Sequence, residues 1–357
     1  MNFIITLLIL FVMLGLIISI HEFGHFIAAK KSGVHVDEFS IGMGPLVFKK
    51  KPKNSETTYS LRLFPIGGFV AMAEKEEKGS KIKKDRVLEN KGFFRILWVL
   101  IDGIVFNFIL AIMLFFISGL IYGKPVNEPI VKEVVEGKAA YLAGLESGDK
   151  IISVNGVSVN TWDDFLLEVS AKKLKDNYEF VVEKPNKEVK TYSISPEVTK
   201  NEKGEEVRVF GIVSNGTTYK KGFLNALSYA FVGTYDNAVT IFRILGSLFT
   251  GQVSVKNLSG PVGIYSIVDQ VKSQGLQTLI YLTAYLSINV GIVNLIPVPV
   301  FDGGRIFILI IEKIIRRKTG EKLENALNYI GFGLMILLML FVTFNDITRL
   351  VVGWYGK

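Results

Sequence analysis

The sequence predicts a polytopic α-helical membrane protein with one β-rich domain between its second and third membrane segments. Of its 357 residues, 49% are hydrophobic and only 21% are charged. A bilayer core of roughly 30 Å requires about 20 apolar residues of helix. Four runs without a charged side chain meet that length, so we expect about four transmembrane helices. The runs are residues 1–20, 103–122, 273–301 and 325–345.

The first run could instead be a cleaved signal peptide, but no basic residues precede it and no small-residue cleavage site follows it. The third run contains Gly291, Asn294, Pro297 and Pro299 near its end. We therefore expect that helix to break there, which a membrane tolerates only where protein or a cavity covers the backbone. The fourth run is apolar all round, which favours a lipid-facing helix.

The remaining segments complete four predicted parts. Residues 1–123 form an N-terminal membrane half, 124–221 a β-rich domain, 222–272 an interfacial amphipathic segment and 273–357 a C-terminal membrane half. In 222–250 the apolar spacing is near 3.6, with Asp236 and Arg243 opposite, which is typical of a helix lying at the membrane surface.

The net charge of +8 is concentrated in two connections between membrane segments. Residues 28–97 contain 15 Lys or Arg against 8 Asp or Glu, and residues 302–324 contain 6 against 4. Basic connections stay in the cytoplasm, so both termini and the β-rich domain are predicted to be extracytoplasmic. The charge therefore indicates orientation and does not predict a nucleic-acid partner.

The β-rich domain shows short alternating stretches at 151–154 and 178–182, turns at Asn155-Gly156 and Pro185-Asn186, and a helix over 162–174 that Asn160 or Thr161 could cap. The ordered run of residues 137–145, 148–151 and 154–156 resembles a PDZ domain of the bacterial protease type. Such domains bind an extended peptide by adding a strand. The alternative is a small β-rich domain without a ligand.

The pattern His21-Glu22-Phe23-Gly24-His25 directly continues the first apolar run. In a helix the two imidazoles lie on one face, and Glu22, about 100° away, can hold a water beside a shared metal ion. The pattern also arises by chance in soluble proteins, where it could cap a helix. At membrane depth, however, unpaired ionisable groups are expensive, which favours metal binding.

A catalytic zinc site needs a third protein ligand, and the absence of cysteine restricts it to His or a carboxylate. His35 reads as a surface residue, Asp102 as an interfacial cap or ion-pair partner, and Asp346 as an interfacial anchor. We favour Asp302, because it follows the predicted break in the third segment and lies at the same membrane depth as the two histidines. The adjacent Gly303 and Gly304 would allow sharp backbone turns.

Together these motifs resemble the site-2 protease family of intramembrane zinc metalloproteases, in its bacterial regulator of sigma-E protease (RIP metalloprotease) branch. The resemblance implies that His21, His25 and Asp302 ligate one zinc ion and that Glu22 activates water. It further implies substrate contact by Asn294, Pro297 and Pro299, and a membrane-associated β-hairpin containing Gly42, Gly44, Gly67 and Gly68. The motifs that carry it are residues 21–25, 39–45, 64–70, 258–264, 294–304 and 344–346.

Two departures from the family pattern stand out. About 100 residues between segments two and three accommodate one PDZ-like domain, whereas many members of the branch have two. The sequence reads Asp102-Gly103-Ile104 before Asn107, where the family often has Gly-Pro. The role of a bend at that position is therefore open.

The expected function is zinc-dependent intramembrane endoproteolysis in the bacterial cytoplasmic membrane, with the active site near its cytoplasmic side. The resemblance implies single-pass membrane substrates, such as an anti-sigma factor, that an upstream site-1 protease has already trimmed. The alternatives are a non-catalytic PDZ membrane scaffold, a metal-binding sensor or a metal transporter. The Glu between the two histidines argues against storage, and the scarcity of ionisable residues in segments three and four argues against transport.

Overall fold

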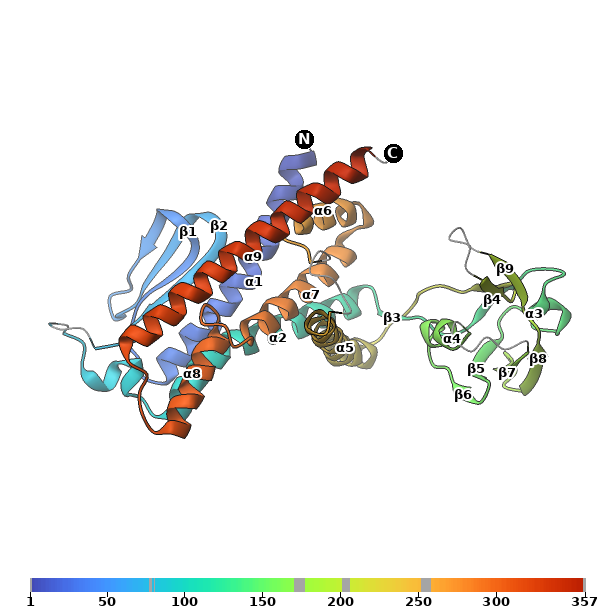
Figure 1. Ribbon diagram of the computed structural model, residues 1–357, viewed down its shortest axis with the longest axis horizontal. Coiled ribbons are helices and arrows are strands. Elements are labelled where there is room, and N and C mark those ends of the chain that lie inside the picture. The colour runs from blue at the N-terminus through green and yellow to red at the C-terminus, as the bar shows by residue number, and fades with distance from the viewer. Residues whose placement is uncertain are drawn as a thin grey trace. The chain divides into compact units, whose positions relative to one another are not determined.

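The computed structural model describes residues 2–76, 79, 81–169, 177–200, 206–251 and 258–355 (Figure 1). The chain divides into two compact units. Met1–Ile121 and Ala226–Lys357 form the membrane unit, and Tyr122–Asn225 forms the β-rich unit. The predicted domain 124–221 lies inside the second of these. The structure joins the two predicted membrane halves into one unit, while the finer division into four parts stays a prediction.

Among the described residues, four helices of the membrane unit are long and apolar enough to cross a membrane, in agreement with the number expected. Three extend further than their uncharged runs, the last of them to Tyr355, ten residues beyond Asn345. The first continues for eleven residues beyond Ile20, so the His-Glu pattern is helical, and the second begins ten residues before Gly103. The four are α1 (Asn2–Lys31), α2 (Phe93–Ile121), α7 (Leu276–Asn294) and α9 (Glu321–Tyr355).

In the part of this unit that the structure describes, three further α-helices are α5 (Phe223–Phe249), α6 (Pro261–Val271) and α8 (Asp302–Ile315). Helix α5 is not among the candidate spans, in keeping with its predicted amphipathic character. Its Ala230 and Ile241 are buried with Phe115 of α2 and Ile288 of α7 in one apolar core. This core holds α2 and α7 side by side and so fixes the level at which α7 ends.

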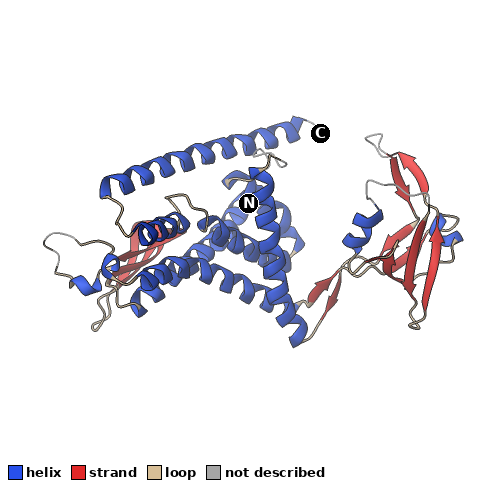
Figure 2. Cartoon of the chain, turned by 60° about the horizontal axis from the view of Figure 1, so that its bottom comes forward, coloured by secondary structure: helices blue, strands red, loops and turns tan. Residues whose placement is uncertain are grey.

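Strands β1 (Val36–Lys50) and β2 (Thr58–Met72) form a hairpin beside α1 (Figures 1 and 2). Both strands bend. The four residues 38–41 of β1 face 68–71 of β2 on one side and 58–61 on the other. Gly42 and Gly44 have φ values of +83° and +84°, a conformation that favours glycine, so they permit the bend in β1.

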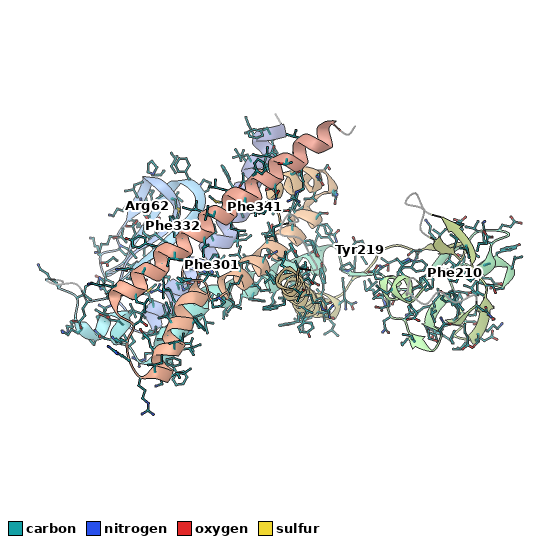
Figure 3. All side chains as sticks on the ribbon, in the orientation of Figure 1. Arg62, Phe210, Tyr219, Phe301, Phe332 and Phe341 are labelled. Carbon is teal, nitrogen blue, oxygen red and sulfur yellow. The ribbon has the colours of Figure 1, made fainter. Side chains whose placement is uncertain are left out.

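The hairpin exposes an apolar surface made of side chains that are each at least two-fifths exposed. Its one central cation is neutralised internally: Arg62 (Figure 3) pairs with Glu38 at 3.0 Å and donates to the Gly44 carbonyl at 3.0 Å. An apolar face with its charge satisfied suits contact with lipid. Membrane association of the hairpin nevertheless stays a prediction. The surface consists of Ile41, Met43, Leu46, Val47, Phe48, Leu61, Leu63 and Phe64.

Glu56, in the loop between β1 and β2, ties the hairpin to α1 and to the segment before α2. Its carboxylate receives hydrogen bonds from Arg86 and Lys30, both at 2.7 Å, and faces His35 Nδ1 at 3.0 Å. The Arg86 guanidinium, followed by Lys30, lowers the pKa of Glu56 from about 4.5 to about 2. The carboxylate therefore stabilises this junction above its unfolded pKa, and that stabilisation is lost as pH falls toward the folded value.

We expect amide exchange in the 51–57 loop to accelerate as pH is lowered from about 5 to about 2, after correction for intrinsic exchange. Hydrogen–deuterium exchange of the wild type and Glu56→Gln measures this. The variant should exchange faster than wild type at neutral pH and respond less to acid. An identical acid response in the two proteins would contradict the role given to Glu56.

Asp346, predicted to be an interfacial anchor, pairs with Arg349 at 3.3 Å near the end of the candidate span, but α9 continues to Tyr355 and the side chain is buried. Its Oδ2 accepts the backbone N–H groups of Gly260 at 2.9 Å and Gly263 at 2.8 Å, at the N-terminus of α6. A Cβ on Gly263 would lie 2.8 Å from Asp346 Oδ1. The two motifs 258–264 and 344–346 are thus halves of one contact between α6 and α9.

The described residues of the β-rich unit form an antiparallel four-stranded sheet in the order β6-β5-β7-β8 and three two-stranded pairs. The Asn155-Gly156 turn joins β5 to β6 with both φ values positive, as predicted. The described strands of the β-rich unit are β3 (Lys124–Val126), β4 (Val131–Val134), β5 (Lys150–Val154), β6 (Val157–Ser158), β7 (Tyr178–Glu183), β8 (Val189–Ile194), β9 (Glu197–Lys200), β10 (Glu206–Val209), β11 (Ile212–Ser214) and β12 (Thr218–Lys220).

Helix α3 (Ala139–Leu142) is short, and α4 (Trp162–Val169) is the described part of the helix predicted over 162–174. Residues 170–174 lie outside the described range. Thr161 caps α4 as expected: its Oγ1 accepts from the Asp164 N–H at 3.1 Å, and the Asp164 carboxylate accepts from the Thr161 N–H at 2.9 Å. Phe165 and Phe210 (Figure 3) pack in the core of the unit.

Candidate active site

The two histidines of α1 converge as their helical spacing predicts. His21 and His25 are both buried, and their Nε2 atoms lie 3.2 Å apart. His25 Nδ1 lies 2.7 Å from the carbonyl oxygen of Val99 on α2. A carbonyl only accepts, so Nδ1 carries the proton and Nε2 of the neutral ring presents a lone pair. The ring is thereby held in the tautomer that binds a metal through Nε2.

Asp302 reaches the same point from the other end of the chain. Helix α7 ends at Asn294, and α8 begins at Asp302 after a non-helical stretch, as expected for the third segment. Asp302 Oδ2 lies 3.1 Å from Nε2 of His21 and 3.2 Å from Nε2 of His25. The break in the helix is therefore what brings a carboxylate to the histidines.

Gly303 and Gly304 act differently from the sharp turns that the sequence suggested. Both lie in the first turn of α8, without positive φ values. A Cβ on Gly303 would lie 2.3 Å from the Leu295 carbonyl oxygen, and a Cβ on Gly304 would lie 2.3 Å from that of Val298. The glycines allow α8 to pack directly on the preceding backbone, which positions Asp302.

Within the part of the chain that the structure describes, His21, His25 and Asp302 are the one group of three that could hold a metal ion. His35 instead pairs with Asp37 and Glu56. Asp102 is not an interfacial cap: it lies inside α2 and is buried. Neither residue joins the site.

The three converging atoms match the requirements of a zinc ion. Tetrahedral zinc with bonds of about 2.0–2.1 Å separates neighbouring ligand atoms by about 3.3 Å, close to the distances found here. Asp302 Oδ2 is buried and, among the described residues, has no hydrogen-bond partner of suitable geometry. Lone pairs that face one another in a buried space repel unless a cation lies between them, so the donor set fits a divalent metal.

A cavity of about 350 Å³ opens beside this group. Its lining includes Glu22, Asn294, Arg305, and Val70 and Met72 of β2. The backbone of Val70 lies close to the Glu22 carboxylate. The predicted base, the predicted metal ligands and one edge of the hairpin therefore share a single cavity, with room for water.

Among the other predicted substrate-contacting residues, some lie beside this cavity and some lie outside its lining. Pro299 lines an adjacent larger groove of about 1140 Å³, and Pro297 is outside both linings. A Cβ on Gly68 would lie 3.4 Å from Glu22 Cγ. Gly42, Gly44 and Gly67 belong to the bends of the hairpin, where all three have positive φ.

Sequence reasoning gave no role to Gly103, which the structure places against both imidazoles. A Cβ on Gly103 would lie 2.5 Å from His25 Nε2 and 2.8 Å from His21 Cε1. Gly24 makes the reciprocal contact, since a Cβ added to it would lie 2.4 Å from the Asp102 carbonyl oxygen. Helix α2 is continuous here, so close packing of two glycines, and not a bend, brings α2 to the site. The only sequence signal was a glycine inside each helix.

Comparison with known proteins agrees with this geometry. The model of peptidase family M50 matches residues 9–338. The chain belongs to peptidase family M50. It is 32% identical to the regulator of sigma-W protease RasP of Bacillus subtilis, over 98% of this chain and 99% of the relative. It is 37% identical to a putative zinc metalloprotease of Fusobacterium nucleatum, over 97% of this chain and 99% of that relative.

A third relative, a putative zinc metalloprotease of Clostridium acetobutylicum, is 34% identical over 93% of this chain and 94% of its own. The matches span nearly the whole of this M50 chain and of each relative. The resemblance to the site-2 protease family is thereby confirmed, and the chain is a zinc metalloprotease of that family.

Proposed function

We propose that this M50 protein is an intramembrane endopeptidase in which His21, His25 and Asp302 hold one zinc ion and Glu22 is the general base. The observation that carries the proposal is the convergence of two Nε2 atoms and one carboxylate oxygen within 3.2 Å of one another, beside Glu22, in a unit with four candidate membrane helices. The scaffold and sensor alternatives do not require a base in the cavity.

Bound zinc would act as a Lewis acid that polarises the scissile carbonyl and acidifies the attacking water. Glu22 takes a proton from that water and delivers it to the leaving amine nitrogen. The Val99 carbonyl oxygen holds the His25 ring in the tautomer with Nδ1 protonated. The cavity of about 350 Å³ has space for the one water that hydrolysis consumes.

The substrate would bind unwound along the outer edge of β2. A helix shields its peptide bonds by its own hydrogen bonds, so a transmembrane substrate must open before cleavage. Residues 68–71 pair with β1 on one side, and the described residues supply no strand on the other. Val70 and Met72 of this edge line the cavity, so an added strand would enter it. Asn294, Pro297 and Pro299 would shape the backbone on the facing side.

The substrate class we propose is a single-pass membrane protein already trimmed outside the membrane, for example an anti-sigma factor. The name of the Bacillus relative, regulator of sigma-W protease, supports this choice. The β-rich unit would be an extracytoplasmic PDZ-like domain that docks or size-selects such substrates after a site-1 protease has acted. Both termini would then be extracytoplasmic, with the active site near the cytoplasmic side of a bacterial cytoplasmic membrane.

Metal dependence tests the proposal directly. Protein reconstituted in vesicles with a transmembrane helix substrate should lose cleavage on exposure to a strong chelator and regain it on addition of zinc. Asp302→Asn should lose bound zinc, while Asp102→Asn, a matched buried carboxylate on α2, should keep it. Zinc content follows from elemental analysis. Cleavage that survives complete zinc removal would reject the function, and zinc lost from the second variant alone would reject Asp302 as the ligand.

A further inference from the structure

Asn107 lies beside the histidine pair, on the helix opposite α1. It belongs to α2 and is completely buried. Its Nδ2 lies 3.3 Å from Nδ1 of His21. Its Oδ1 is buried and, within the described residues, has no hydrogen-bond partner. An amide in a membrane helix is expensive when only half satisfied, so this arrangement requires a physical explanation.

The tautomer of His21 that zinc ligation requires supplies this physical explanation. A histidine that ligates through Nε2 needs its lone pair there, so the neutral ring of His21 carries its proton on Nδ1. An N–H group needs an acceptor, yet Nδ2 of Asn107 can only donate. The two ends of an amide are nearly isosteric, so turning it over places Oδ1 against Nδ1. The ring proton then has an acceptor, which Nδ2 cannot provide, and Nδ2 takes the place that Oδ1 had.

Contacts with α7 fix the main chain of Asn107 beside His21. Ser287 donates a hydrogen bond from its hydroxyl to the Asn107 carbonyl oxygen at 2.8 Å. A Cβ on Gly291 would lie 3.5 Å from Asn107 Cβ, in ordinary contact. The helix that ends at Asn294 and leads to Asp302 therefore also sets the position of this amide.

We propose that Asn107 is a positioning residue whose Oδ1 accepts a hydrogen bond from Nδ1–H of His21 in the zinc-loaded enzyme. It thus does for His21 what the Val99 carbonyl does for His25. The inference rests on the proposed zinc site, because it presumes that His21 is a ligand. Such outer partners fix the orientation of a ligating ring, and their loss weakens metal affinity about 10- to 100-fold.

Zinc affinity of the full-length protein in detergent, measured by competition with a chromophoric chelator, tests this without relying on cleavage. Asn107→Leu should bind zinc about 10- to 100-fold more weakly. Asn107→Asp should bind within about threefold of wild type or more tightly, because a carboxylate accepts a hydrogen bond and cannot donate one. Ser118→Ala, which alters a buried polar side chain of the same helix α2 away from the histidines, should match wild type.

Two results would overturn the inference: wild-type affinity in Asn107→Leu, or affinity in Asn107→Asp as low as in Asn107→Leu. Should Asn107→Leu fail to fold, Asn107→Asp still decides, since a weakened affinity there means that the amide acts as a donor. The zinc affinity of His21→Ala, measured in the same titration, distinguishes failure of the proposed zinc site from failure of the role given to Asn107. If it keeps wild-type affinity, His21 is not a ligand and both proposals fail. If it loses zinc while Asn107→Leu does not, the zinc site stands without this role for Asn107.

Discussion

Glu22→Gln is expected to reduce the cleavage rate about 10²- to 10⁴-fold while leaving zinc bound. The amide keeps the size of the side chain but cannot take a proton from water. Zinc should stay because the three converging atoms belong to His21, His25 and Asp302, and Glu22 is not among them. The measurement is single-turnover cleavage of a transmembrane helix substrate in vesicles, with zinc content determined on the same preparation.

Asp102→Asn is the matched control for this experiment. It also converts a buried carboxylate to an amide in the membrane unit, but Asp102 is not one of the three converging ligands. It should keep the wild-type cleavage rate. Cleavage retained in Glu22→Gln would remove Glu22 as the base, whereas loss of zinc in that variant would show that its carboxylate contributes to metal binding.

Gly103→Val should abolish zinc binding without touching a ligand. Even the first added carbon would lie 2.5 Å from His25 Nε2, so the side chain must displace the imidazoles or push α2 away from α1. We expect zinc affinity to fall by more than about 100-fold, beyond the loss caused by one outer partner. Gly103→Ala should show a smaller loss in the same direction, because a methyl group displaces less.

A second glycine of α2 supplies the control. A Cβ on Gly119 would lie 2.8 Å from the Ala226 Cα of α5, so Gly119→Val also strains helix packing, but far along α2 from the histidines. It should lower thermal stability and keep its zinc affinity. Equal zinc loss in the two variants would mean that general misfolding, and not contact with the histidines, explains the effect of Gly103→Val.

The local features of the site were accessible from sequence because they depend on short-range periodicity. Histidines four residues apart share a helix face whatever the rest of the protein does. The clustering of Asn294, Pro297 and Pro299 likewise signals a helix end, and α7 does end at Asn294. The Asn155-Gly156 turn and the Thr161 cap follow from the same kind of local chemistry.

The sequence misjudged residues whose environment is made by distant segments. Asp102 and Asp346 were expected at membrane interfaces, because charged residues usually mark the ends of apolar runs. Both helices instead continue past them, and packing buries both side chains. Gly303 and Gly304 were interpreted as turn residues, although their requirement for glycine comes from the backbone of residues 295 and 298.

By itself, the sequence determined that four apolar segments exist, that His21 and His25 can share a metal, and that a break precedes Asp302. Each of these follows from residue type and spacing along one helix. Only the tertiary structure decided that Asp302 meets the two histidines within 3.2 Å, that Gly103 leaves room for their rings, and that Asn107 faces His21. Those contacts join residues up to 281 positions apart, and their geometry depends on how closely α1, α2 and α7 pack. No local pattern encodes that distance.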